Sequence, residues 1–337
     1  MKGLRRLIAW TLALTFLALP CVRARAGSDE VRRGYGAGSA ALELQGSPVG
    51  FLRSASGGDL EGDVVATPAA SGFNKHIASV HYTDLVLEVG AGMEPAVYDW
   101  IAAAWESKAT RTSGAVAIAD YSFNVIARKE FSEALITETS LPALDAASKD
   151  PAFLTVRIAP ETVRRNKGGG TVPSTQAAKQ RPWLANSFRL EIPGLDCTRV
   201  RRIEPIRIGT KITHDDAGET RTTPVNEPTT TKVSDLVVTL PEANADTWLD
   251  WMQQFLAQGR NDDSQEKNGD LVLLGTDMQS EIARIHLYGL GISSLKQTKA
   301  DNVDAIRSVV CTLYCEHAAL EWKGGGGAVL NVRVFGR

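Results

Sequence analysis

Two similar stretches lie about 150 residues apart in the sequence, and this repetition restricts the fold more than any other feature. Thr83–Val89 aligns with Ser234–Leu240 at a constant offset of 151, and the same offset carries Asp99-Trp100 onto Asp250-Trp251. In both stretches apolar residues alternate with other residues, which indicates a β-strand with one buried face. Because the strand and the residues after it recur together, we expect two copies of one folding unit.

An amphipathic helix is expected after each of these strands. Apolar residues recur there at the i, i+3, i+4, i+7 spacing that predicts one buried helix face. The first helix would begin at Pro95, which is well tolerated in a first helical turn. The predicted buried residues are Val97, Trp100, Ile101, Ala104 and Trp105 in the first copy, and Trp248, Trp251, Met252, Phe255 and Leu256 in the second.

Matches continue on both sides of the strand and helix. Upstream, Leu42–Gly46 matches Leu190–Gly194, and downstream Ile126–Arg128 matches Ile282–Arg284. We expect each downstream match to end the second arm of a hairpin, and each copy to close with a further strand. The first arms are expected at Ala115–Ala119 and Leu271–Leu274, and the closing strands at Phe153–Ile158 and Ser308–Tyr314.

Short strands separated by turn signals predict a mainly β (α+β) fold with two tandem small antiparallel β-barrel or sandwich domains, each with one flanking amphipathic helix. Two long loops, Gly57–Lys75 and His214–Thr231, occupy the same place in each copy. The predicted plan is a signal peptide over 1–26, an N-terminal segment over 27–38, the first domain over 39–165, a glycine-rich flexible linker over 166–186, the second domain over 187–323, and a glycine hinge with a strand-like tail over 324–337. The tail is expected to add to a sheet edge of its own or a neighbouring subunit.

The amino terminus has the pattern of an export signal. Three basic residues within the first six precede the apolar stretch Leu7–Leu19, and Ala24-Arg25-Ala26 provides small residues for cleavage after Ala26. This predicts a secreted or periplasmic protein with no membrane insertion after cleavage, because no later segment reaches the ~20 apolar residues of a membrane helix. A retained anchor, a misassigned start and lipidation at Cys21 are the alternatives.

Composition argues against some classes of protein, and the cysteine positions limit which disulfides can form. With 43% hydrophobic and 23% charged residues the chain is an ordinary globular one. Removing the five bases before residue 27 leaves 32 bases against 39 acids, which argues against a nucleic-acid binder. Cys311 and Cys315, four apart on one strand, would lie about 13 Å apart, too far for a disulfide. Either of them could pair with Cys197, or all three could be buried thiols.

No chemical motif predicts catalysis. The histidines lack metal-ligand spacing, and Cys315 with His317 lacks a third orienting group. Asp84 and Asp235 are expected to cap turns or contact a neighbouring subunit, and the tryptophans of the helices to anchor the core. We therefore predict no catalytic, metal or cofactor site and no enzyme activity. The histidines are His76, His81, His214, His286 and His317, and a basic stretch that meets an acidic neighbour or is solvated comprises Arg157, Arg164, Arg165, Lys167, Lys179 and Arg181.

The order of these elements is similar to that of a known family. A Leu-Glu-hydrophobic-x-Gly strand, a long loop, an Asp-Leu-hydrophobic strand, a helix carrying Asp-Trp and a hairpin resemble the contractile-phage tail-tube protein family, which is related in fold to the haemolysin-coregulated tube protein of type VI secretion. The resemblance covers Ser39–Arg165 and Phe188–Lys323. It implies that six small barrels close a ring, that rings stack into a tube, and that the long loops contact the next ring.

The resemblance leads to one function hypothesis and two rivals. The first is a secreted structural protein that self-assembles into rings or tubes, three two-domain chains giving a pseudo-hexamer. The alternative is a monomeric or low-oligomer extracellular binding module that keeps the fold without forming a tube and binds through the two long loops. The third is an exported hydrolase, for which no residue is a candidate.

Overall fold

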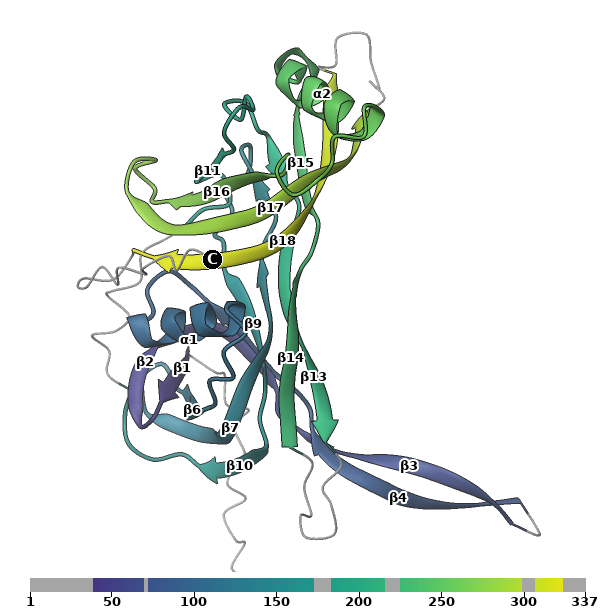
Figure 1. The fold of residues 1–337 in the computed structure, drawn as a ribbon. Coiled ribbons are helices and arrows are strands. Elements are labelled where there is room, and N and C mark those ends of the chain that lie inside the picture. The colour runs from purple at the N-terminus through teal and green to yellow at the C-terminus, as the bar shows by residue number, and fades with distance from the viewer. Residues whose placement is uncertain (1–38, 70–71, 173–182, 216–224, 299–306, 324–337) are drawn as a thin grey trace, which may run out of the picture. The chain divides into compact units, whose positions relative to one another are not determined.

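The computed structural model describes residues 39–69, 72–172, 183–215, 225–298 and 307–323 (Figure 1). Strands make up 60% of the structure and helices 11%. The first half contains β1 Ser39–Leu44, β2 Ser47–Gly57, β3 Leu60–Ala69, β4 Gly72–Tyr82, β5 Leu85–Val89, α1 Pro95–Trp105, β6 Thr112–Ala119, β7 Val125–Leu141, β8 Leu144–Asp145, β9 Leu154–Ala159 and β10 Thr162–Lys167. The second half contains β11 Phe188–Glu191, β12 Arg202–Ile203, β13 Ile206–Asp215, β14 Val225–Val233, β15 Leu236–Pro241, the 3₁₀ turn η2 Glu242–Asn244, α2 Asp246–Met252, the π-helical turn η3 Gln253–Ala257, β16 Lys267–Leu274, β17 Glu281–Gln297 and β18 Ser308–Trp322.

The first half forms a closed six-stranded antiparallel barrel. Its strands follow the order β1-β2-β5-β9-β7-β6 and return to β1. The predicted alternation in β5 is present, since Leu85, Leu87 and Val89 are each 1% exposed while the residues between them are half-buried. Period-two alternation is what a barrel wall with one core-facing side requires.

The second half repeats this strand order without closing. Its sheet runs β11-β16-β17-β18-β15-β12, in the same order as the matching strands of the first barrel. β11 and β12, the counterparts of β1 and β2, do not pair with each other, so the sheet stays open. β18 is one long strand where the first half has β9 and β10, separated by Pro160. Proline cannot donate a ladder hydrogen bond, which explains a break at that point. The prediction of two mainly β domains is confirmed, and the common strand order agrees with the predicted duplication.

The two halves also exchange strands. β13 of the second half pairs with β7 of the first barrel, and β8 of the first half pairs with β12 in the second sheet. One hydrophobic core includes residues of both halves. Within it the rings of Tyr98 and Trp322 stack with centroids 3.5 Å apart. The sequence boundary between the predicted domains therefore does not separate two independent sheets.

Each half has the predicted flanking helix. In α1 all five residues of the predicted stripe are buried, and Trp100 donates its indole N–H to the carbonyl of Thr110 at 2.9 Å. In the second helix Trp248, Trp251 and Phe255 are buried, but Leu256 is 44% exposed, so its predicted burial is wrong. The cause is η3, because a π-helical turn holds more residues than an α turn and rotates the following side chain off the stripe.

Other predictions need correction. Gly57–Lys75 and His214–Thr231 are not loops: their described parts belong mostly to the hairpins β3–β4 and β13–β14. Ile126–Arg128 and Ile282–Arg284 lie near the start of the second hairpin arms, β7 and β17, and not at their end. Both arms are 17 residues long, and sequence patterns did not reveal their extension.

The predicted linker is packed where it is described. Residues 166–167 belong to β10, Val172 is 5% exposed beside Phe51 and Ala117, and Trp183 is 3% exposed. The described ends of the predicted 166–186 linker are thus packed on the protein. The predicted signal peptide, the N-terminal segment over 27–38 and the tail over 324–337 lie outside the described residues. No helix in the described ranges is long and apolar enough to cross a membrane.

Candidate assembly surface

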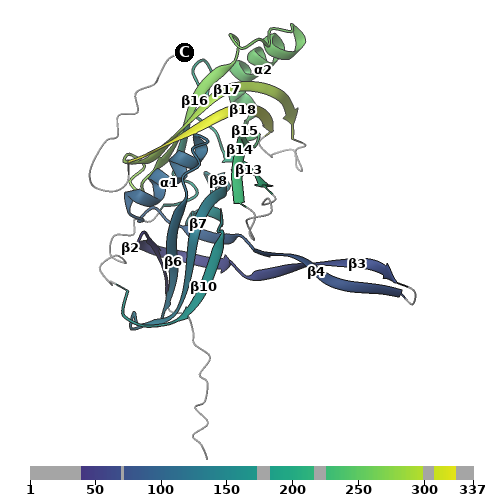
Figure 2. The same cartoon turned by 60° about the horizontal axis from the view of Figure 1, so that its bottom comes forward.

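The most unusual surface of the protein is the β3–β4 hairpin. It forms a two-stranded sheet of its own and stands apart from the two larger sheets in both views (Figures 1 and 2). All ten residues of β3 are exposed, as are ten of the eleven residues of β4. Its exposed large apolar residues are Leu60 61%, Val64 63%, Val65 41%, Phe73 69%, Ile77 64% and Val80 51%. An isolated two-stranded hairpin is at best marginally stable in water, so this one is suited to packing against a partner.

The base of the hairpin is firmly held. The backbone N–H of Thr83 donates to the carbonyl of Asp59 at 2.9 Å, and the N–H of Asp59 donates to the Thr83 hydroxyl at 3.0 Å. Gly57, at φ +80, turns the chain from β2 into β3, and a Cβ there would lie 1.9 Å from the carbonyl oxygen of Asp84. Only glycine fits both conditions, which fixes where the hairpin leaves the barrel.

The β13–β14 hairpin has the same base. The N–H of Ser234 donates to the carbonyl of Arg207 at 2.8 Å, and the N–H of Arg207 donates to the Ser234 hydroxyl at 3.0 Å. Arg207 and Ser234 are thus the counterparts of Asp59 and Thr83. The two hairpins leave their sheets by the same pair of reciprocal hydrogen bonds.

Unlike β3–β4, the β13–β14 hairpin is docked. β13 pairs with β7 over Ile206–Gly209, and Ile208 is 3% exposed. Thr231 of β14 lies 2.8 Å from the Ser107 hydroxyl, just beyond the end of α1. The second half therefore extends the first barrel's sheet with its own hairpin.

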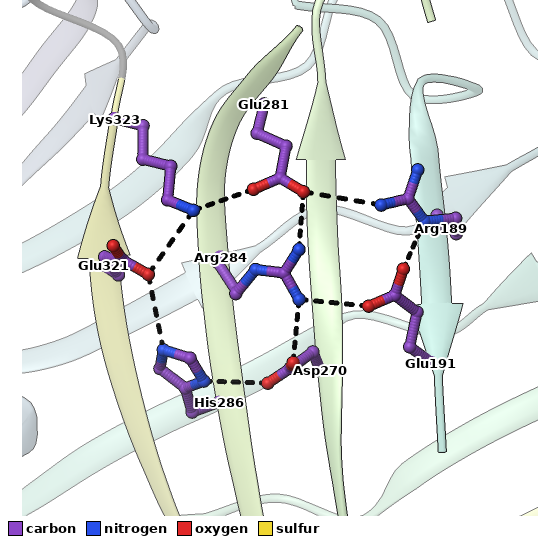
Figure 3. A network of polar contacts seen from close by, with 8 residues as sticks. All are labelled: Arg189, Glu191, Asp270, Glu281, Arg284, His286, Glu321 and Lys323. Carbon is purple, nitrogen blue, oxygen red and sulfur yellow. Dashed lines mark hydrogen bonds and ion pairs between the residues drawn. The ribbon is translucent and has the colours of Figure 1, made fainter. Parts of the chain in front are cut away.

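A polar network covers the exposed face of the second sheet (Figure 3). At its centre Arg284 of β17 donates to Glu191 of β11 at 3.0 Å and to Asp270 of β16 at 2.8 Å, and also bonds Glu281. Lys323, just after β18, lies 2.8 Å from Glu281. These contacts link four neighbouring strands side to side.

Further members complete the ring of contacts seen in Figure 3. The Nδ1 of His286 lies 2.8 Å from Asp270, and its Nε2 lies 3.5 Å from Glu321. Arg189 lies 2.5 Å from Glu191. Three Arg or Lys side chains face four carboxylates, so the network has a net charge of −1 when His286 is neutral. This balance suits cross-strand bracing and not the binding of an anion.

Two members have displaced pKa values. Hydrogen bonds from Lys323 and then Arg284 lower the pKa of Glu281 to about 2. For Arg284, partial burial disfavours the charged form, but hydrogen bonds to the three surrounding carboxylates outweigh it and raise its pKa. Both shifts favour the charged forms and keep the network intact over the physiological pH range.

The first barrel carries the same central pair. Arg128 donates to Glu43 in a bidentate contact, with one N–O distance of 2.9 Å. Glu43 and Arg128 occupy the positions matched in sequence to Glu191 and Arg284, and a shallow hollow lies over them. The match between these residues was predicted from sequence, but the contact between them was not. The signal was available, because an acid and a base recur at matched positions of two predicted strands.

The paired aspartates and tryptophans behave as structural residues. Asp84 accepts a hydrogen bond from Thr137 at 3.2 Å at the start of β5, and Asp235 is exposed at the start of β15. Trp100 and Trp251 are 6% and 7% exposed and lie on the core side of their helices. The prediction that both tryptophans anchor the core is confirmed.

One described cysteine contacts the backbone of a neighbouring histidine. Cys197, Cys311 and Cys315 are free thiols, and burial raises the pKa of Cys315 to about 11. The Cys315 thiol donates to the backbone carbonyl of His317 at 3.2 Å, while the exposed His317 ring stacks on Tyr288. Within the described ranges, no group of three or more His, Cys, Asp or Glu residues could hold a metal ion.

The histidines and the basic residues occupy separate surfaces. His76 and His81 are exposed on β4, His286 belongs to the network, and His214 lies in β13. Arg165 lies 3.5 Å from Asp59. Of the basic stretch, Arg157, Arg164, Arg165 and Lys167 are exposed on β9 and β10, and Lys179 and Arg181 lie outside the described residues.

Comparison with known proteins agrees with this architecture. Residues 43–164 match the family model described as T4-like virus tail tube protein gp19. The resemblance to the tail-tube family is confirmed. The match covers most of the first barrel together with its hairpin and helix, and it supports a tail-tube-like fold for that half.

Matches among solved structures were also found, whereas a comparison with curated proteins found none. The anti-feeding prophage cap, which terminates its tube, is 19% identical with a TM-score of 0.36, covering 43% of this chain and 99% of that one. A sheath-tube complex of an extracellular contractile injection system is 18% identical with a TM-score of 0.35, covering 41% and 94%. Hcp1 from Flavobacterium johnsoniae is 17% identical with a TM-score of 0.29, covering 40% and 99%.

Proposed function

We propose that this protein is a structural subunit that self-assembles into rings or tubes and has no catalytic role. The observation that carries the proposal is the β3–β4 hairpin, whose large apolar residues are 41–69% exposed and which pairs with no other described strand. The match of residues 43–164 to a tail-tube family model supports the same conclusion. Symmetric self-association covers such a surface without requiring a different partner.

Three chains would complete one ring. Each chain carries two barrel-like halves with a common strand order, so three chains supply the six barrels of a pseudo-hexamer. The export pattern at residues 1–26 would place this assembly in the periplasm or outside the cell. Nucleic acid has no part in the proposal, because the chain beyond the signal region is acidic.

Light scattering on the purified protein tests the assembly across a range of concentrations. The expected result is a trimer or a multiple of it, with rings visible by negative-stain electron microscopy. As a control, Leu60→Asp and Ile77→Asp together place charges on the exposed hairpin and should give monomers with unchanged circular dichroism. Wild-type protein that stays monomeric at every concentration would refute self-assembly and favour the extracellular binding module.

A further inference from the structure

The two hairpins can be aligned residue by residue. The pairs Leu60–Tyr82 and Ile208–Val233 occupy the same place above their matching bases. Leu60 is 61% exposed, whereas Ile208, docked on the first barrel, is 3% exposed. The chain thus contains one hairpin in its docked state and an equivalent hairpin whose docking site is not filled.

The edge of β7 that receives the docked hairpin has a counterpart on β17. In the pairing of β7 with β9 and in that of β17 with β18, one residue is bulged, Thr137 and Ser293 respectively, at matched positions. Each bulged hydroxyl lies within hydrogen-bond distance of a carbonyl on the neighbouring strand, Thr137 3.2 Å from that of Arg157 and Ser293 3.0 Å from that of Thr312. The four residues after the bulge are therefore equivalent in β7 and β17.

Residues 138–141 of β7 and residues 294–297 of β17 differ in what pairs with their outer edge. In β7, residues 138–140 pair with β9 on one side, and residues 138–141 pair with β13 on the other. In β17, residues 294–297 pair with β18 on one side. On the other side the pairing of β16 ends at Lys267–Leu290, and no described strand follows it. An unpaired edge of this kind is a template for a strand from another chain.

We infer that β3 of a second copy of this chain adds to this edge of β17, in the register by which β13 adds to β7. Transposing the pairs of Ile206–Gly209 with Leu141–Glu138 gives Gly58 opposite Gln297, Asp59 opposite Lys296, Leu60 opposite Leu295, and Glu61 opposite Ser294. The inference deepens the self-assembly proposed above and depends on it.

The transposed register brings complementary side chains opposite each other. Asp59 and Lys296 are exposed and of opposite charge, and Leu60 meets the half-buried Leu295. Opposite charges and apolar side chains directly across two antiparallel strands both stabilise their pairing. Each chain would give its first hairpin to the second half of its neighbour, a head-to-tail contact that closes into a ring.

Cysteine cross-linking tests the register. Two variants of the whole chain, Asp59→Cys and Lys296→Cys, are purified separately, mixed under mild oxidation and separated by non-reducing electrophoresis. Residues directly opposite in a sheet lie within the ~7 Å that a disulfide spans. The mixture should give a dimer, whereas either variant alone and the wild-type chain should not. The chain carrying both cysteines should give a ladder that ends at three chains.

A matched control replaces the receiving position by one at the other end of β17. Asp59→Cys mixed with Gln279→Cys, an exposed residue just before β17, should give no dimer. Equal cross-linking with Gln279→Cys would overturn the register. Particles that assemble by light scattering but give no 59–296 cross-link would overturn the inference and leave self-assembly standing. A wild-type protein that never assembles would overturn both.

Discussion

The hairpins β3–β4 and β13–β14 leave their sheets by the same hydrogen bonds but end in opposite surroundings. β13 lies on the edge of β7 with Ile208 buried, whereas β3 has every residue exposed. The difference does not come from local geometry, because the bases match. It comes from the available sheet edges, since β13 meets the edge of β7, whereas β3 pairs only with β4 among the described strands.

The helices repeat the comparison. α1 contacts β13 and β18 of the second half, and Trp105 at its end is 1% exposed. Its counterpart by sequence, Leu256, is 44% exposed. The end of the helix is thus covered in the first half and exposed in the second. The exposed positions of the second half mark the surface that a neighbouring chain would cover.

The largest effect is expected at the helix ends. Trp105→Ala should destabilise the protein by about 3–5 kcal/mol, the usual range for removing a buried tryptophan. Leu256→Ala should cost roughly 0.5 kcal/mol in a monomeric sample, because that side chain is already partly solvated. Urea unfolding of both variants at low protein concentration measures the difference. Equal losses would mean that the two helix ends are not in different environments.

Ile208→Ala and Leu60→Ala compare the hairpins themselves. Ile208→Ala should cost about 2–4 kcal/mol through lost burial and a cavity, and Leu60→Ala less than about 0.5 kcal/mol in the monomer. Assembly should respond in the reverse sense, with Leu60→Ala weakening it. Unfolding curves and light scattering on the same samples report the two effects separately. A large loss of monomer stability in Leu60→Ala would contradict its exposure.

Much of the fold could be predicted because the strands and helices follow from the local spacing of apolar residues. The alternation of Leu85, Leu87 and Val89 and the helical stripe around Trp100 depend only on spacing, and both are present. Leu256 was misplaced because a π turn leaves no mark in apolar spacing. The pairing of β13 with β7 could not be predicted from local patterns either. It joins residues that are far apart in the sequence, such as Ile206 and Leu141, and it depends on the whole barrel.

The candidate surface was predicted less well than the fold. The sequence of Gly57–Lys75 predicts a loop, because its polar and small residues have the composition of turns. Only the structure shows that Val64, Val65 and Ile77 are exposed on a hairpin. Their exposure depends on which surfaces the rest of the chain leaves uncovered, which is not a local property of sequence.

The ion pairs allow a comparison that depends on pH. Both halves have the Glu–Arg pair, but only the second half adds Glu281 to it. The residue of β7 that matches Glu281 is the buried Val125. The pKa of Glu281 is lowered from 4.5 to about 2, so its stabilisation is present above pH 4.5 and is lost as the pH falls toward 2. Allowing for solvent screening, the contribution is roughly 1–2 kcal/mol.

Glu281→Gln isolates this contribution. The variant should be less stable than wild type at pH 5, and the difference should shrink as the pH approaches 2, because the wild-type carboxyl is then protonated as well. Urea unfolding at several pH values measures it. Lys323→Gln, which removes the first of the two donors, should show the same convergence at about half the size. A difference that does not change between pH 5 and 2 would rule out the carboxylate as its source.

The smallest expected effect separates a specific strand pairing from general stickiness of the hairpin. Lys296→Glu should weaken assembly by roughly two- to fivefold, since an exposed ion pair contributes about 0.2–1 kcal/mol. Asp59→Lys should do the same, and the chain with both substitutions should recover to within about twofold, because the reversed charges again lie opposite each other. Glu61→Lys, the same charge change opposite the uncharged Ser294, is the control and should not be rescued by Lys296→Glu. Sedimentation at two salt concentrations gives the affinities, and rescue of Glu61→Lys in place of Asp59→Lys would place the register two residues away from that of the docked hairpin.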